Sequence, residues 1–214
     1  MNKILFIDTL ATGLSSERCA LYRIGGVFCE EQEGVISERR RFELCMRPFE
    51  GARINDNSLW LSGTTRSRLI YYPEQEKAFA DFAALVGERV SVANPHDKMY
   101  LAGYNTAATD MPFLMRWYER CGDRHFRDCF HVQPLDIMGV AALTLMDRRR
   151  AMDGFQMEAA AAELGVTARR GERYSCLDNA LTCLDMYVAL KRRLGLGDIR
   201  RGEALQEVFI NARP

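Results

Sequence analysis

The apolar positions of the first fifty residues form runs rather than helical stripes. Residues 4–7 are a continuous apolar run, which is typical of a strand covered on both faces, and Asp8 follows where such a strand surfaces. Residues 19–30 and 38–49 are rich in β-forming side chains, and the polar, glycine-containing residues 31–37 join them. We therefore predict a strand beside a hairpin of two longer strands.

After this hairpin the apolar positions change to helical spacing, interrupted by short apolar runs. The predicted elements are, in order, helix 74–90, strand 99–103, helix 110–120, strand 132–135 and helices 136–146, 156–164 and 179–194. Three antiparallel strands followed by strand-helix alternation predict one α/β domain, with a five-stranded mixed sheet flanked by α-helices. Residues 195–214 lack a clear pattern, so we expect a C-terminal tail that forms a short helix or an arm.

Charge limits the possible partners. The chain has 214 residues, 48% of them hydrophobic, which is enough to bury a full core. Lys plus Arg and Asp plus Glu each total 29, so no net field attracts nucleic acid or an anionic membrane, and a polyanion site must be a local patch. Three basic clusters are either solvated helix ends or phosphate contacts: residues 148–150, 169–170 and 192–193.

The seven cysteines form no CxxC pair and are odd in number, which indicates reduced core thiols in a cytoplasmic protein. The apolar run at the start of the chain is too short for a signal peptide. Because no apolar stretch approaches the ~18 residues that span a bilayer, we predict no membrane association.

Three short motifs carry the candidate chemistry. The first is Asp8 followed by Thr-Gly-Leu at residues 12–14, the second is AGYNTAATDMPFL at 102–114, and the third is LDNALTCLDMYVAL at 177–190. In order and spacing they resemble the motifs of the DEDDh family of 3′-5′ exonucleases, which includes proofreading subunits and oligoribonuclease. The resemblance implies a ribonuclease H-like fold and an exonuclease-like domain over residues 1–194. By analogy with oligoribonucleases it also suggests a homodimer.

The family resemblance implies a site in which acidic residues hold two Mg²⁺ or Mn²⁺ ions. Asp8 and Asp110 match the first and second acids. Leu10 stands at the family's Glu position, Asp178 at the position of its His base, and Cys183 at that of its final Asp. Leucine offers no ligand atom and a thiol suits hard Mg²⁺ poorly. With three of five positions substituted, we expect metal binding at Asp8 and Asp110 to be weak or vestigial.

The same resemblance implies that the Thr-Gly-Leu turn and an Asn of the second motif seat the terminal nucleotide. The candidate substrate contacts are therefore Thr12, Gly13, Leu14 and Asn105. The residues alone leave simpler interpretations open, since the glycine suits a turn and the leucine suits a core. Asp185 is no replacement for the lost acid, because two residues along a helix rotate the side chain by roughly 200°.

Three hypotheses of function remain open from the sequence. In the first, the chain is an exonuclease homologue with a degenerate catalytic centre, which binds little or no Mg²⁺ or Mn²⁺ and still binds a single-stranded DNA or RNA end or a protein partner. In the second, Asp8, Asp110 and a repositioned Asp178 support a slow, metal-dependent 3′-5′ exonuclease. In the third, the chain is an interaction subunit of a larger nucleic-acid or defence complex, with the tail after Gly195 as its contact.

Overall fold

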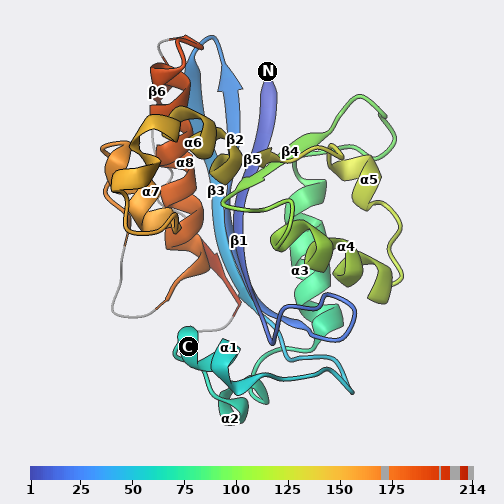
Figure 1. The fold of residues 1–214 in the computed structure, drawn as a ribbon. Helices are drawn as coiled ribbons and strands as arrows, with labels where there is room; N and C mark the ends of the chain where they lie inside the picture. Colours follow the sequence, from blue (N-terminus) through green and yellow to red (C-terminus); the bar gives the residue numbers. More distant parts are fainter. Residues whose placement is uncertain (170–173, 198, 203–207, 212–214) are drawn as a thin grey trace.

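The computed structural model of this chain describes residues 1–169, 174–197, 199–202 and 208–211, and its centre is one mixed sheet with helices on both sides (Figure 1). The sheet order is β5-β4-β1-β2-β3-β6, and β7 also pairs with β3. The long antiparallel strands are β1 (Asn2–Ala11), β2 (Leu21–Gln32) and β3 (Val35–Cys45). The short strands are β4 (Met99–Gly103), β5 (Leu135–Asp136), β6 (Arg200–Arg201) and β7 (Val208–Ile210).

The helices divide between the two faces of the sheet. They are α1 (Asp56–Leu61), α2 (Arg66–Leu69), α3 (Gln75–Gly87), α4 (Asp110–Arg120), α5 (Phe126–Cys129), α6 (Ile137–Thr144), the 3-10 helix η1 (Met146–Ala151), α7 (Met157–Glu163) and α8 (Cys176–Arg193). Helices α3 and α4 lie on one side of β1, and α6, α7 and α8 lie on the other (Figure 1).

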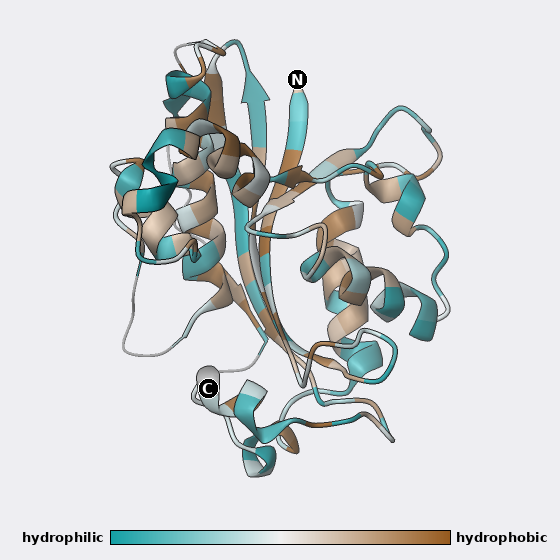
Figure 2. Ribbon diagram, in the orientation of Figure 1, coloured by the Kyte–Doolittle hydropathy of each residue, from teal (hydrophilic) through white to brown (hydrophobic). Residues whose placement is uncertain are grey.

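The first strand shows why the chain folds around this sheet. Leu5 and Ile7 pack in the core that includes α3 and α4, whereas Ile4 and Phe6 pack in the core that includes α6, α7 and α8. Side chains alternate across a strand, so a strand with a helix layer on each face needs apolar residues at every position. Hydrophobic residues accordingly gather along the central strands and on the helix faces that meet them (Figure 2).

The predicted α/β architecture, a mixed sheet flanked by helices, is confirmed, while some element bounds differ. Strand β1 continues to Ala11, because β2 still pairs with it there, opposite Leu21, after a register shift between Leu10 and Ala11. Asp8 therefore lies within the strand rather than at its end. The predicted helix 136–146 stops at Thr144, where the 3-10 helix η1 takes over.

The described residues of the tail are extended rather than helical. Strands β6 and β7 pair in parallel with β3, so the described sheet has seven strands instead of the predicted five. Beyond β7, the Asn211 side chain accepts a hydrogen bond from the Cys45 backbone N at 2.7 Å and donates one to the Cys45 carbonyl at 3.0 Å. Runs of two and three residues give no periodic pattern, which is why the sequence did not indicate them. The domain boundary near residue 194 remains a prediction.

All seven cysteines are free thiols, and only Cys121 among them is partly exposed. This agrees with the predicted reduced core thiols. Over the residues that the structure describes, no helix is both long and apolar enough to cross a membrane. The cytoplasmic location remains a prediction.

Candidate functional site

The predicted acids come together where β1, the start of α4 and the start of α8 converge. Helix α8 lies close against the sheet because β2 has a glycine there: a Cβ on Gly25 would be 2.7 Å from the carbonyl carbon of Cys176. Glu43 on β3 fixes the helix start, since its Oε1 accepts a hydrogen bond from the Cys176 backbone N at 2.9 Å. Ser175 caps the helix through the Asp178 backbone N–H.

Neutral side chains of the chain itself surround the Asp8 carboxylate. Its Oδ2 accepts hydrogen bonds from the Tyr174 hydroxyl at 3.0 Å and from the Asn179 side-chain amide at 3.2 Å. The same amide donates to the Tyr174 hydroxyl at 2.7 Å. Asp8, Tyr174 and Asn179 are therefore mutually hydrogen-bonded. Asn179 lies within the third motif but was assigned no role from the sequence, and Tyr174 lies outside all three motifs.

Asp110 begins α4 and is held in a similar way. Its carboxylate accepts hydrogen bonds from the Thr9 hydroxyl at 2.7 Å and from the Thr109 hydroxyl at 3.1 Å. The Asp110 residue is 3% exposed, so the acid is almost wholly enclosed. Its interactions tie α4 to β1 next to Asp8.

The surroundings of Asp8 and Asp110 favour the protonated, neutral form of their carboxyl groups. Burial, followed by the charge of Asp110, raises the pKa of the Asp8 carboxyl. Burial also raises the pKa of Asp110. A raised carboxyl pKa means that the folded protein favours the neutral acid, and two adjacent carboxylates resist simultaneous ionisation unless a cation compensates them. The pair thus holds a proton more readily than an isolated acid does.

Two of the substituted positions are occupied by apolar or neutral groups. Leu10 packs against a small cluster that includes Tyr22 and Leu59. Cys183 is buried, with its Sγ 3.6 Å from the Met157 sulfur. Burial, followed by the charges of the two acids, raises the pKa of the Cys183 thiol well above its usual value, so the thiol is neutral at pH 7.

Asp178, at the third substituted position, lies half-buried in the first turn of α8. Across the described part of the chain, no group of three or more His, Cys, Asp or Glu side chains is placed to hold a metal ion. Mg²⁺ needs several oxygen ligands in near-octahedral geometry. A half-buried Asp8, an enclosed Asp110 and a neutral thiol do not fit the pair of ions that the family motifs imply.

A buried cation lies beside the site. Arg23 pairs in register with Leu10 across β1 and β2 and is only 5% exposed. Its guanidinium donates to the Tyr174 carbonyl at 2.8 Å and to the Tyr72 hydroxyl at 3.4 Å. Among the described residues its buried Nε has no hydrogen-bond partner. In the sequence, Arg23 is a single arginine within an apolar strand, and it belongs to none of the three motifs.

The Thr-Gly part of the first motif has a structural role. The Thr12 hydroxyl donates to the Arg53 carbonyl at 2.6 Å and accepts from the Ala20 backbone N at 3.0 Å. A Cβ on Gly13 would be 2.7 Å from the Cys19 sulfur, so a larger residue there would displace the Cys19 thiol. Both residues are buried and hold the loop that follows β1.

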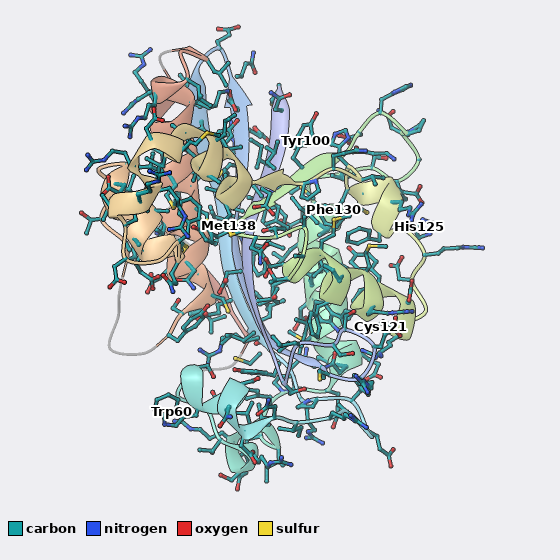
Figure 3. The ribbon with its side chains drawn as sticks, in the orientation of Figure 1. Trp60, Tyr100, Cys121, His125, Phe130 and Met138 are labelled. Carbon is teal, nitrogen blue, oxygen red and sulfur yellow. The ribbon has the colours of Figure 1, made fainter. Side chains whose placement is uncertain are left out.

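The other two candidate contacts are more open. Leu14 is 100% exposed, which excludes the core-packing interpretation. Asn105 has a left-handed backbone with φ of 63°, and its backbone N donates to Asp136 at 3.1 Å. The residues between β3 and α3, which the sequence left without elements, form α1 and α2. They carry Trp60, which is 78% exposed and lies at the lower edge of the molecule in Figure 3.

No protein-family profile and no curated protein sequence matches this chain. Solved structures do match. A product-bound exonuclease I superposes with a TM-score of 0.70 at 12% identity, over 92% of this chain and 45% of that chain. The Escherichia coli exonuclease I complex with a dT13 oligonucleotide gives 0.68 at 14% identity, over 92% and 42%. Exonuclease I from Methylocaldum szegediense gives 0.68 at 13% identity, over 90% and 40%.

These similarities define the class of fold. The chain spans less than half the length of the exonuclease I structures that it matches. At such identities the likeness establishes a shared fold, so the ribonuclease H-like prediction is confirmed at this level. One further neighbour is a zinc-bound complex of E. coli exonuclease I with single-stranded DNA, in which the ion belongs to that protein.

Proposed function

We propose that this chain is an exonuclease-like protein that binds an end of single-stranded nucleic acid and whose catalytic centre is degenerate. One observation carries the proposal: Asp8 and Asp110, which match the family's first two acids by motif, already accept hydrogen bonds from Tyr174, Asn179 and threonine hydroxyls. A carboxylate that accepts hydrogen bonds within its own protein has less to gain from a metal ion.

The substituted positions support the same conclusion. Leu10 packs against an apolar cluster, and this burial of apolar surface stabilises the fold without any metal ion. At the position of the family's final Asp, Cys183 places a neutral thiol instead of a third carboxylate. Burial and the charges of Asp8 and Asp110 raise the pKa of this thiol. Without a metal ion, fewer adjacent carboxylates cost less free energy, so these substitutions suit a protein that no longer binds one.

Retained nucleic-acid binding is supported by the fold and by one exposed side chain. Exonuclease I structures of this fold contain the oligonucleotides dT13 and dA16. Leu14 follows the buried Thr-Gly turn and is fully exposed, so the turn presents to solvent an apolar side chain of the kind on which a base packs. The proposal thus separates binding, which needs the surface loop, from hydrolysis, which needs the acids.

The test combines metal titration with digestion. Mn²⁺ is titrated calorimetrically into the protein and into Asp8→Asn, and the same samples receive end-labelled single-stranded DNA and RNA. We expect no Asp8-dependent metal binding and no digestion, together with oligonucleotide binding that persists in chelator. Digestion that Asp110→Asn abolishes would refute the degenerate site. Protein that binds no oligonucleotide would direct the search to protein partners.

A slow exonuclease is the second candidate, favoured by one observation. Asp178 retains a half-buried carboxylate in the first turn of α8, which is the helix that carries Asn179 to Asp8. This candidate requires trace digestion with Mn²⁺ that is lost in Asp178→Asn and in Asp110→Asn alike. Trace activity that survives both substitutions belongs to a contaminant.

A further inference from the structure

A pocket unrelated to the acids lies between the loop after α7 and the C-terminal half of α8. Its volume is about 800 Å³, within the usual range for small-ligand sites. We call it the α8 pocket, and the side chains that matter in it are Leu164, Val166, Val188, Arg192, Arg193 and Arg201. Asp185 also lines it, so that acid faces away from Cys183 as the helical spacing predicts.

Two arginines of the α8 pocket are fixed in place without losing their charge. The Arg192 Nε donates to the Ile199 carbonyl at 2.8 Å, and the Arg193 guanidinium donates to the Glu163 carbonyl at 3.3 Å. Backbone carbonyls orient a guanidinium but do not neutralise it. Within the described residues neither side chain forms an ion pair with a carboxylate.

The third arginine of the pocket is different. Arg201 pairs with both Asp185 and Glu38, and Asp185 also pairs with Arg169 at 2.9 Å. The pocket lining therefore has three arginines against one carboxylate, and the excess positive charge lies at Arg192 and Arg193. A guanidinium group binds phosphate through two parallel hydrogen bonds, so each of these two arginines is suited to that anion.

The rest of the lining fits the remainder of a nucleotide. Leu164, Val166 and Val188 provide an apolar wall next to the charged end. A ligand with a flat apolar part and a phosphate matches such a division, in which apolar contacts supply area and a few polar groups fix the orientation. A simple inorganic anion would use only the arginines.

We propose that the α8 pocket binds a phosphate group, carried by a free nucleotide or by the backbone of single-stranded nucleic acid, through Arg192 and Arg193. Fifteen residues of α8 separate Asp178 from Arg193, or about 22 Å along the helix axis. The pocket is thus a second site, distinct from the acids. Only its polynucleotide source rests on the function proposed above.

The alternative role for these arginines is to stabilise the end of α8, because cations favour a helix C-terminus. That role would change the stability of the protein and leave anion binding untouched. The experiment must therefore measure both properties.

The test compares Arg192→Gln/Arg193→Gln with a matched control, Arg124→Gln/Arg127→Gln, which removes two exposed arginines beside α5. Inorganic phosphate and AMP are titrated calorimetrically, and labelled dT13 is followed by fluorescence polarisation at several salt concentrations. We expect the pocket variant to bind weaker by about tenfold or more. For dT13 the slope of log K against log salt should become shallower by about 1.4, for two lost phosphate contacts. The control should match the parent protein.

A second variant, Arg192→Lys/Arg193→Lys, keeps the charge at the helix end and loses the planar fork. Weaker binding at an unchanged melting temperature supports the proposal even if the Gln variant folds poorly. Loss of dT13 alone assigns the pocket to the polynucleotide backbone, and loss of AMP as well assigns it to a nucleotide. Equal binding by the parent, both pocket variants and the control overturns the proposal. So does a parent protein that binds none of the three probes.

The two proposals fail in different ways. Leu14→Ala should weaken dT13 binding while AMP and phosphate still bind in the α8 pocket. If Leu14→Ala has no effect on dT13 while the pocket variant abolishes it, the α8 pocket stands and the proposed end-binding site does not.

Discussion

The two ends of α8 treat charge in opposite ways. At the N-terminal end, the Asp8 carboxylate is enclosed by the neutral donors Tyr174 and Asn179. At the C-terminal end, backbone carbonyls hold Arg192 and Arg193 in position and leave their charge available. An internally satisfied group contributes to the fold, whereas an oriented and uncompensated group can bind a ligand. This difference is what the proposed phosphate site at the C-terminal end of α8 rests on, because the acids at the N-terminal end already accept hydrogen bonds within the protein.

The largest effect should come from displacing the N-terminal end of α8. Gly25→Ala places a Cβ against the backbone of Cys176, so the helix must shift, and we expect the free energy of unfolding to fall by about 3 kcal/mol. Chemical denaturation measures it. Gly139→Ala is the control, because a Cβ there meets nothing within 4 Å and alanine favours the helix. Equal effects of the two substitutions would contradict the close packing at Gly25.

The next effect is a pH dependence at Asp8. Its pKa is raised in the folded protein, so between about pH 4 and the folded pKa the native state binds more protons than the unfolded state, and stability falls as the pH rises. Asp8→Asn removes this term and keeps an acceptor for Tyr174. We expect the variant to gain about 2 kcal/mol over the parent at pH 8 and little at pH 4. Denaturation at both pH values measures the gain, and an equal gain at each would contradict it.

A smaller effect should follow at the start of α8 from Glu43→Gln. The substitution keeps an oxygen for the Cys176 backbone N–H and removes the negative charge that favours a helix N-terminus. We expect a loss of about 1 kcal/mol that shrinks at high salt, measured by thermal unfolding at two ionic strengths. Glu50→Gln, at an exposed loop position, should change stability little. A loss of stability that does not depend on ionic strength would indicate that hydrogen-bond geometry, and not charge, is responsible.

The smallest effect on stability belongs to the other end of the helix. Arg192→Gln/Arg193→Gln should lower the free energy of unfolding by only about 0.5 kcal/mol, because both side chains are exposed and interact weakly with the helix dipole. Thermal unfolding measures it. A loss as large as that of Gly25→Ala would mean that the two arginines hold the fold together, and the contrast between the ends of α8 would then disappear.

The sequence predicted the layers of the fold well, because they depend on local periodicity. The continuous apolar run of β1 and the helical spacing of α3 each follow from a single element. Strands β6 and β7 could not be predicted, since two or three residues carry no period and their pairing with β3 is long-range. The motif spacing also brought Asp8 and Asp110 together correctly.

The hydrogen-bond partners of those acids could not be predicted from local sequence patterns. Tyr174 lies just before α8 and Asn179 within it, and their bonds to Asp8 join positions more than 160 residues apart. From its position alone, Leu10 could be predicted to stand where the family has a metal-binding glutamate. That it packs with residues of α1 and α2 depended on a segment for which the sequence gave no element.

The pairing of Leu10 with Arg23 bears on how this protein can evolve. Side chains paired across antiparallel strands have Cβ atoms about 5 Å apart, so a glutamate restored at position 10 would meet a buried guanidinium before any metal ion. The two would form an ion pair and compete with metal binding. We therefore expect the single substitution Leu10→Glu to form a salt bridge with Arg23 rather than a metal ligand, so that a metal site at this position would require Arg23 to change as well.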